Sequence, residues 1–195
     1  MQHIFPTQVT PKEYFNLGTD FPFPKPKTCP NPSCHVPRPP KGHGYYERNI
    51  LTLEFEGRIL IRRYYCPYCK HTFSYLPSFC LPYFQYSLEL IFYAIFFHFF
   101  KWAVLLMSLI PTYPVNWCVQ HQQFYAKRFL NNRKLIQVGL RQLLAEVQLP
   151  DWRDITKGAQ DLLTIVVSGF EGIQAFSQRF FQQCNCSFMA PCKLL

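Results

Sequence analysis

Residues 62–73 read RRYYCPYCKHTF, and residues 28–34 read TCPNPSC. The later stretch places Cys66 and Cys69 at a C-x2-C spacing, and the earlier one places Cys29 and Cys34 at C-x4-C. Two thiolates on one short turn can reach the same tetrahedral zinc ion, about 2.3 Å from each sulfur, and a second turn completes the four ligands. These four cysteines therefore predict one structural Zn²⁺.

The interval between the cysteine pairs has the pattern of a β-hairpin. In NILTLEFE, residues 49–56, every second residue from Leu51 is apolar, and Gly57 then interrupts the run. RILIRRYY leads directly into Cys66. We expect a hairpin that brings the second cysteine pair to the first. Because so small a sheet has little core of its own, zinc is expected to supply much of its folding energy, on the order of 10 kcal/mol.

Other readings of these side chains stay open. Free structural thiols fit the same segment, and so does a site in which His35, His43 or His71 replaces a cysteine. Cys80 lies among apolar residues, which favours burial as a small hydrophobic side chain. The last three cysteines, Cys184, Cys186 and Cys192, could form a second metal site, but they lack an obvious fourth ligand.

Composition indicates a folded chain in a reducing compartment. Of the 195 residues, 49 % are hydrophobic and 18 % aromatic, which is enough for a packed core. The first residues, MQHIFPTQVTPKEYF, lack the basic and apolar regions of a secretory signal. We therefore expect a cytoplasmic protein whose paired cysteines bind metal and do not form disulfides.

The positive charge is concentrated in two segments. The net charge is +9, of which residues 1–85 supply +5 and residues 111–149 supply +4. Segregated basic charge favours a polyanion partner, with nucleic acid first and an anionic membrane second. In the first segment the candidate nucleic-acid ligands are Lys41, His43, Arg48, Arg58, Arg62, Arg63 and Lys70.

A family resemblance supports this reading. CPNPSC, HGYYERN and IRRYYCPYCKHTFSYLPSFCLPYFQYSLELI resemble the zinc ribbon of insertion-sequence transposases, and more closely a family of small transposase-related proteins of spore-forming bacteria. The resemblance covers roughly residues 28–92 and implies association with DNA. The chain departs from that pattern in its x4 first knuckle and in Cys80. The family pattern falls on Cys29, Cys34, His43, Gly44, Tyr46, Arg48, Cys66, Cys69, Thr72, Phe73, Leu76, Pro77, Pro82 and Tyr83.

The chain beyond residue 86 has helical patterns in the order of a helix-turn-helix. A helix is predicted to begin at the N-cap Ser87 and to continue through KWAVLLMSLI, residues 101–110. TYPV forms a turn, and NWCVQHQQFYAKRFLNN begins the next helix, in the place of a recognition helix. The same polar residues also fit the solvated face of an ordinary amphipathic helix. The candidate base contacts are Gln120, Gln122 and Gln123, and the candidate phosphate or guanine contacts are Lys127, Arg128, Arg133 and Lys134.

Residues 90–110 are long enough to span a bilayer. His98 and Lys101 fall near the centre of this run, where a lysine costs roughly 3 kcal/mol to insert. They lie three residues apart, on one helical face, as in a soluble amphipathic helix. A membrane anchor is therefore the less favoured reading.

The last part of the chain is predicted to be helical and non-catalytic. An apolar seam runs from Ile136 through Leu140 and Leu143 to Val147. After a break at PDWRDITKG, where Asp151 or Thr156 could cap the next helix, Gly169 and Gly172 predict an interruption. No HExxH, GxSxG or phosphate-binding glycine loop is present, and no strand-rich stretch follows the ribbon to gather carboxylates.

The sequence therefore predicts an α+β protein with a zinc-ribbon hairpin followed by a mainly helical region. The expected segments are an N-terminal extension (1–24), a zinc ribbon (25–85), a helix-turn-helix region (86–149) and a C-terminal helical segment (150–195). The predicted function is zinc-dependent binding of double-stranded DNA, as a non-catalytic accessory or relic of a mobile element or a regulator derived from one, associated with the nucleoid. A transposase or a second copy of the chain is a further expected partner. The alternatives are a zinc-stapled protein-interaction module and a membrane-associated protein anchored by residues 90–110.

Overall fold

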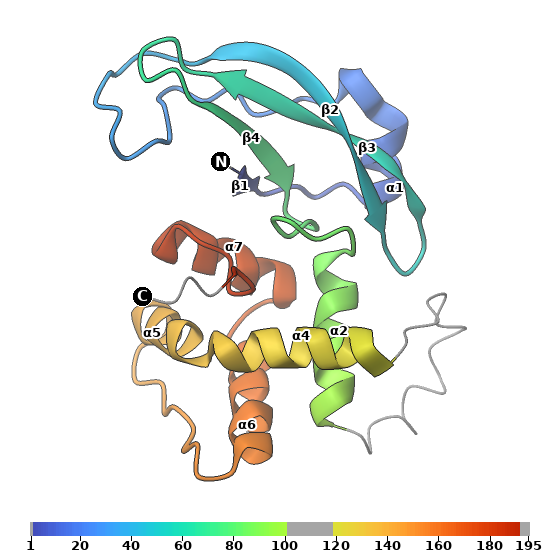
Figure 1. The fold of residues 1–195 in the computed structure, drawn as a ribbon, viewed down its shortest axis with the longest axis vertical. Coiled ribbons are helices and arrows are strands. Elements are labelled where there is room, and N and C mark those ends of the chain that lie inside the picture. Colours follow the sequence, from blue (N-terminus) through green and yellow to red (C-terminus); the bar gives the residue numbers. More distant parts are fainter. Residues whose placement is uncertain (1, 101–118, 192–195) are drawn as a thin grey trace. The chain divides into compact units, whose positions relative to one another are not determined.

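The computed structural model describes residues 2–100 and 119–191 (Figure 1). Within them the chain is α+β, as predicted, and divides into two compact units, Met1–Gln85 and Tyr86–Leu195. The strands belong to the first unit. Four of them form one sheet in the order β1-β4-β3-β2, with β1 at Gln2–Phe5, β2 at Lys41–Leu51, β3 at Glu56–Tyr65 and β4 at Thr72–Pro77.

The segment set apart above as an extension supplies a strand, a helix and a short 3₁₀ turn to this unit. Strand β1 pairs in parallel with β4, whereas β2, β3 and β4 are antiparallel neighbours. Helix α1 (Pro11–Leu17) begins with a capping box in which Thr10 and Glu13 bond each other's backbone N–H. Tyr14 of α1 is buried, and its hydroxyl donates to the Leu60 carbonyl 2.9 Å away, which anchors the helix to β3. A short 3₁₀ turn, η1 (Gly18–Asp20), follows.

The predicted hairpin is present, but its turn lies earlier than expected. The chain turns at Thr52–Phe55, and Gly57 lies inside β3 opposite Ile50. The Thr52 hydroxyl accepts the N–H groups of Glu54 and Phe55, 3.2 and 2.9 Å away, which satisfies the turn. The Phe55 ring folds over Gly57 so closely that a Cβ there would lie 2.6 Å from it. The alternating apolar residues after Leu51 therefore belong to the turn and not to a paired strand.

The expectation of a sheet with little core of its own is wrong. A buried apolar cluster joins β1, α1, the η1 end, both hairpin strands and the segment after β4. Ring contacts between Tyr14, Phe21 and Phe79 lie within it, with centroids 4.4 and 5.7 Å from that of Tyr14. Its buried members are Phe5, Tyr14, Phe21, Ile50, Ile59, Ile61, Leu76, Phe79 and Cys80. The core exists because the N-terminal residues cover the sheet.

The second unit is helical over its described residues. Its helices are α2 (Leu88–Phe99), α4 (Val119–Asn131), α5 (Arg133–Leu143), α6 (Ile155–Ser168) and α7 (Ile173–Cys184). Ser87 caps α2 as predicted, its side chain accepting the Leu90 N–H. The predicted helix over 101–110 and the turn TYPV lie outside the described residues, and so does the turn on which the helix-turn-helix prediction depends.

Two details of the later helices differ from expectation. Helix α5 ends at Leu143, so Val147 does not extend the apolar seam, although Ile136 and Leu140 are buried. The residue that caps α6 is Asp154, whose carboxylate accepts the N–H groups of Thr156 and Lys157. The predicted caps, Asp151 and Thr156, do not cap this helix. The interruption predicted near Gly169 and Gly172 is confirmed by the gap between α6 and α7.

Asn132, a buried residue between α4 and α5, connects these helices to the segment that follows α7. Its side-chain amide donates to the carbonyls of Phe188 and Ala190, 2.9 and 2.8 Å away. No helix of the residues that the structure describes is sufficiently long and apolar to cross a membrane.

Candidate metal centre and basic surface

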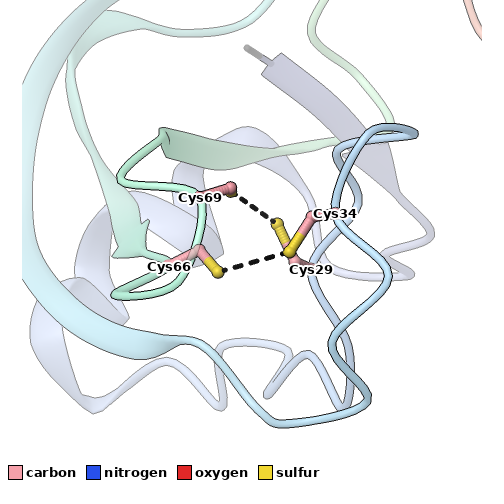
Figure 2. Close-up of side chains that lie close together, drawn as sticks. All are labelled: Cys29, Cys34, Cys66 and Cys69. Atoms are coloured by element: carbon pink, nitrogen blue, oxygen red, sulfur yellow. Dashed lines mark hydrogen bonds between the residues drawn. The ribbon is translucent and has the colours of Figure 1, made fainter.

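The four cysteines singled out in the sequence meet at one end of the sheet (Figure 2). Their sulfur atoms all lie within 4.8 Å of one another. The Sγ atoms of Cys29 and Cys69 are 3.7 Å apart, and those of Cys34 and Cys66 are 3.8 Å apart. No disulfide joins them. Cys29 and Cys66 are buried, whereas Cys34 and Cys69 are half-buried.

The sulfur spacing fits a tetrahedral metal ion. In a regular tetrahedron with metal–sulfur distances of about 2.3 Å, neighbouring sulfurs are about 3.8 Å apart. The two measured separations agree with this edge length. Among the described residues, this is the one group of histidine, cysteine or acidic side chains gathered closely enough to hold a metal, and it contains no histidine. The four cysteines can therefore hold one ion without His35, His43 or His71.

The first cysteine turn is shaped by Asn31. Its backbone carbonyl accepts the Cys34 N–H at 2.8 Å, and its side-chain oxygen accepts the Ser33 N–H at 3.1 Å. Pro30 and Pro32 flank Asn31 and restrict the backbone, since proline fixes φ. The C-x4-C spacing thus forms a closed turn that points both sulfurs the same way.

The second cysteine turn is closed by its own backbone. The Cys66 N–H donates to the His71 carbonyl at 3.0 Å, and Lys70 adopts a left-handed conformation with φ 58°. This conformation lets the chain reverse directly after Cys69 and enter β4. The His71 ring lies 2.7 Å from the Cys69 carbonyl, and this hydrogen bond raises the pKa of His71.

The surroundings of the four thiols shift their pKa values in different directions and favour the thiolate form at Cys69. Burial raises the pKa of the Cys29 thiol to about 12. Burial also acts on Cys69, but hydrogen bonds from the His71 backbone and the Asn31 side chain outweigh it and bring the pKa of Cys69 down to about 6. A thiolate at Cys69 offers a first ligand at neutral pH, and metal binding would displace the protons of the other thiols.

The predicted basic ligands of the first unit fall into two groups. Lys41, His43 and Lys70 are exposed. They lie near the cysteine turns, since Lys70 follows Cys69 directly and Lys41 at the start of β2 pairs with Tyr65, directly before Cys66. The remaining predicted cations, Arg48, Arg58, Arg62 and Arg63, lie farther along the hairpin.

Three arginines of the second group already have partners within the unit. Arg48 donates to the Leu81 and Phe84 carbonyls. Arg58 pairs with Glu47 at 3.4 Å, and both side chains are well exposed. The Arg62 guanidinium lies over the Tyr45 ring, 4.4 Å from its centroid. These contacts give Arg48 a structural role that its sequence position did not indicate.

Helix α4 presents part of its predicted polar set to solvent. Gln120, Gln123 and Lys127 are exposed and recur at helical spacing on one face, and Lys134 of α5 is exposed as well. Gln122 is half-buried, on the side of the helix that buries Tyr125 and Phe129.

Arg128 and Arg133 have contacts inside the second unit. Arg128 donates to the Met189 carbonyl at 3.1 Å, and Arg133 donates to the Leu130 carbonyl at 3.1 Å and lies near the Trp152 ring.

Sequence reasoning missed several exposed groups beside the cysteine turns. Lys25, Lys27 and Arg38 are exposed there, and Arg38 donates to the Tyr68 hydroxyl at 3.2 Å. Tyr68, within the second cysteine turn, is itself 45 % exposed. The signal that could have found them is the absence of acidic residues from the segments that carry the cysteines.

One family model matches part of the chain. It is described as a domain of unknown function (DUF6431), and it matches residues 31–96. The match takes in β2, β3 and β4 and three of the four clustered cysteines, over about a third of the chain. No curated protein and no solved structure matches the chain.

Proposed function

We propose that the first unit is a zinc-stabilised DNA-binding module. In this proposal Cys29, Cys34, Cys66 and Cys69 hold one structural Zn²⁺, and the end of the sheet that carries them contacts the phosphates of duplex DNA. The zinc holds the two cysteine turns together, and the turns carry the basic side chains.

The choice of zinc follows from the ligands. Four thiolates in a tetrahedron suit zinc or iron. A closed set of four protein ligands with no open position is typical of structural zinc, which has no redox chemistry. Elemental analysis of purified protein tests this choice: one zinc per chain is expected, whereas iron together with visible absorption from iron–thiolate bonds would overturn it.

The distribution of charge is the observation that supports DNA binding. Residues 21–46 and 57–85 hold eight Lys or Arg side chains and no Asp or Glu. Zn²⁺ with four thiolates carries two negative charges, which leaves the cations in clear excess. Five of these cations are exposed around the cysteine turns: Lys25, Lys27, Arg38, Lys41 and Lys70. The acidic residues of the unit lie in α1, in η1 and toward the hairpin turn, away from that end.

Two further features support the same partner. Exposed Tyr68 and Tyr45 stand among the cations, as aromatic side chains do on nucleic-acid surfaces. In the second unit, the α4 face with Gln120, Gln123 and Lys127 is the part suited to base contacts. The resemblance to transposase ribbons favours DNA as the polyanion and a role as a non-catalytic accessory of a mobile element or a regulator derived from one.

The test is binding to duplex DNA over a series of salt concentrations. If the five exposed cations each neutralise a phosphate, the logarithm of affinity should fall against the logarithm of salt with a slope of about −4.5. Replacing Lys27, Lys41 and Lys70 together by Gln should flatten that slope by about 3. The matched control replaces three exposed cations elsewhere, Lys12, Lys157 and Arg179, and should leave the slope unchanged.

The control also separates binding at the cysteine end from binding that follows net charge alone. If both triple variants weaken binding equally, the interaction follows net charge alone and the cysteine end is not the site. If binding is absent or independent of salt, the zinc-stapled protein-interaction module replaces DNA binding as the better explanation.

A further inference from the structure

A cavity of about 470 Å³ lies in the first unit at the hairpin-turn end of the sheet. Its lining includes Arg48, Asn49 and Arg58 of the hairpin and Tyr83 and Gln85 of the segment after β4. Arg58 lies seven residues before Tyr65 on β3, so the cavity is about 20 Å from the cysteine turns. The metal centre and its basic surface therefore do not account for it.

Tyr83 is the unusual residue of this cavity. Its φ of 71° is left-handed, a conformation that costs a bulky side chain energy and that Gly or Asn adopts more readily. Tyr83 is 73 % exposed, although Leu81 and Phe84 on the same turn are buried. The Tyr83 ring is therefore open to contacts from outside the chain, on a turn whose neighbouring residues are buried.

The segment that carries Tyr83 is fixed from beneath by Arg48. The guanidinium donates to the Leu81 carbonyl at 2.6 Å and to the Phe84 carbonyl, on either side of Tyr83. The Leu51 N–H donates to the Gln85 carbonyl at 3.0 Å and ties the end of the segment to β2. These hydrogen bonds hold the backbone of the turn that carries the ring.

The groups around the ring match the parts of a nucleotide. An exposed aromatic face stacks on a base with little preference for its identity. The amides of Asn49 and Gln85, both exposed, can donate to and accept from a base edge. Arg58 at the rim pairs at 3.4 Å with Glu47, which also lines the cavity, and with its side chain 69 % exposed it can still contact a phosphate. A volume of this size accommodates one nucleotide.

We propose that this cavity binds an unpaired nucleobase of a single-stranded segment, stacked on Tyr83. A base inside a duplex cannot reach the ring face-on, so the site distinguishes single strands from paired DNA. The inference rests on the proposed function to the extent that both take nucleic acid as the partner, but it uses a different surface.

The experiment measures fluorescence anisotropy of the full chain with three labelled probes: a single-stranded 12-mer DNA, its RNA equivalent and the fully paired duplex. Tyr83→Ala should weaken single-strand binding about 10-fold, which corresponds to about 1.4 kcal/mol, and leave duplex binding unchanged. Tyr83→Phe keeps the ring and should bind as the wild type does. Phe15→Ala, which removes an exposed ring on α1, is the matched control and should have no effect.

Tyr83→Asn separates binding from folding. Because Asn tolerates φ above zero, this variant should keep or raise the melting temperature while losing single-strand affinity as Tyr83→Ala does. If wild-type protein binds duplex but the Tyr83 variants bind single strands normally, the cavity proposal falls and the proposed function stands. If Tyr83-dependent binding of single strands persists without salt-dependent duplex binding, the reverse holds. Binding to none of the probes overturns both.

Discussion

If the four cysteines hold a metal, removing it should open the cysteine turns and leave the sheet folded. Residues 25–40 contain no helix or strand, and their backbone hydrogen bonds, from Cys34 to Asn31 and from Arg38 to Val36, are local. The side-chain contacts of Arg38 with Tyr68 and of Asn31 with His71 and Cys69 are exposed or half-buried, and each contributes little. A metal held by the four cysteines would therefore be the main tie between residues 25–40 and the second cysteine turn.

The size of the effect follows from loop closure. Cys34 and Cys66 are 32 residues apart, and linking them removes conformational entropy worth about 4 kcal/mol from the unfolded chain. Replacing Cys66 by Ser, or chelating the metal, should lower the free energy of unfolding of the first unit by about that amount. The buried cluster around Ile59 and Ile61 does not depend on the tie, so β2 and β3 should remain folded.

Hydrogen exchange followed by mass spectrometry is the suitable assay. Chelation should speed exchange in peptides from residues 25–40 and 66–71, while peptides from β3 stay protected. Cys80→Ala is the matched control, because Cys80 is buried in the core and outside the sulfur cluster, so this variant should retain one metal per chain. Unchanged exchange in residues 25–40 after complete metal removal would refute the reasoning, and so would loss of metal from Cys80→Ala.

Three further substitutions test the packing. Arg48→Lys cannot bond both carbonyls as the guanidinium does, and it should lower the free energy of unfolding by about 2 kcal/mol in urea denaturation; an unchanged value would contradict the structural role of Arg48. Thr52→Ala should cost about 1–2 kcal/mol in the same assay, and Thr52→Ser should restore most of it because the hydroxyl is what closes the hairpin turn. Gly139→Ala places a Cβ 2.3 Å from the Phe180 ring and should lower the melting temperature of the second unit by several degrees; an unchanged melting temperature would contradict the close packing of Phe180 on Gly139.

The parts of the fold that depend on neighbours along the chain could be predicted from the sequence. The C-x2-C and C-x4-C spacings placed the four cysteines correctly, since a short turn constrains two thiols whatever surrounds it. Ser87 at the start of α2 and the break between α6 and α7 are likewise local, because caps and glycine interruptions act over a few residues. The α+β class followed from the same local patterns.

Tertiary structure decided the rest. Strand β1 pairs with β4, which lies some 70 residues later in the chain. The residue pattern of neither segment predicts that the two strands pair in parallel. From the sequence, Arg48 is predicted to contact nucleic acid like the other cations. Its structural role depends on the Leu81 and Phe84 carbonyls, which only the fold brings next to it. Tyr83 reads as an ordinary aromatic residue, because a positive φ at a non-glycine position is imposed by the contacts on either side of it. Local chemistry thus set which residues could bind a metal, and long-range packing determined which cations are free to meet a partner.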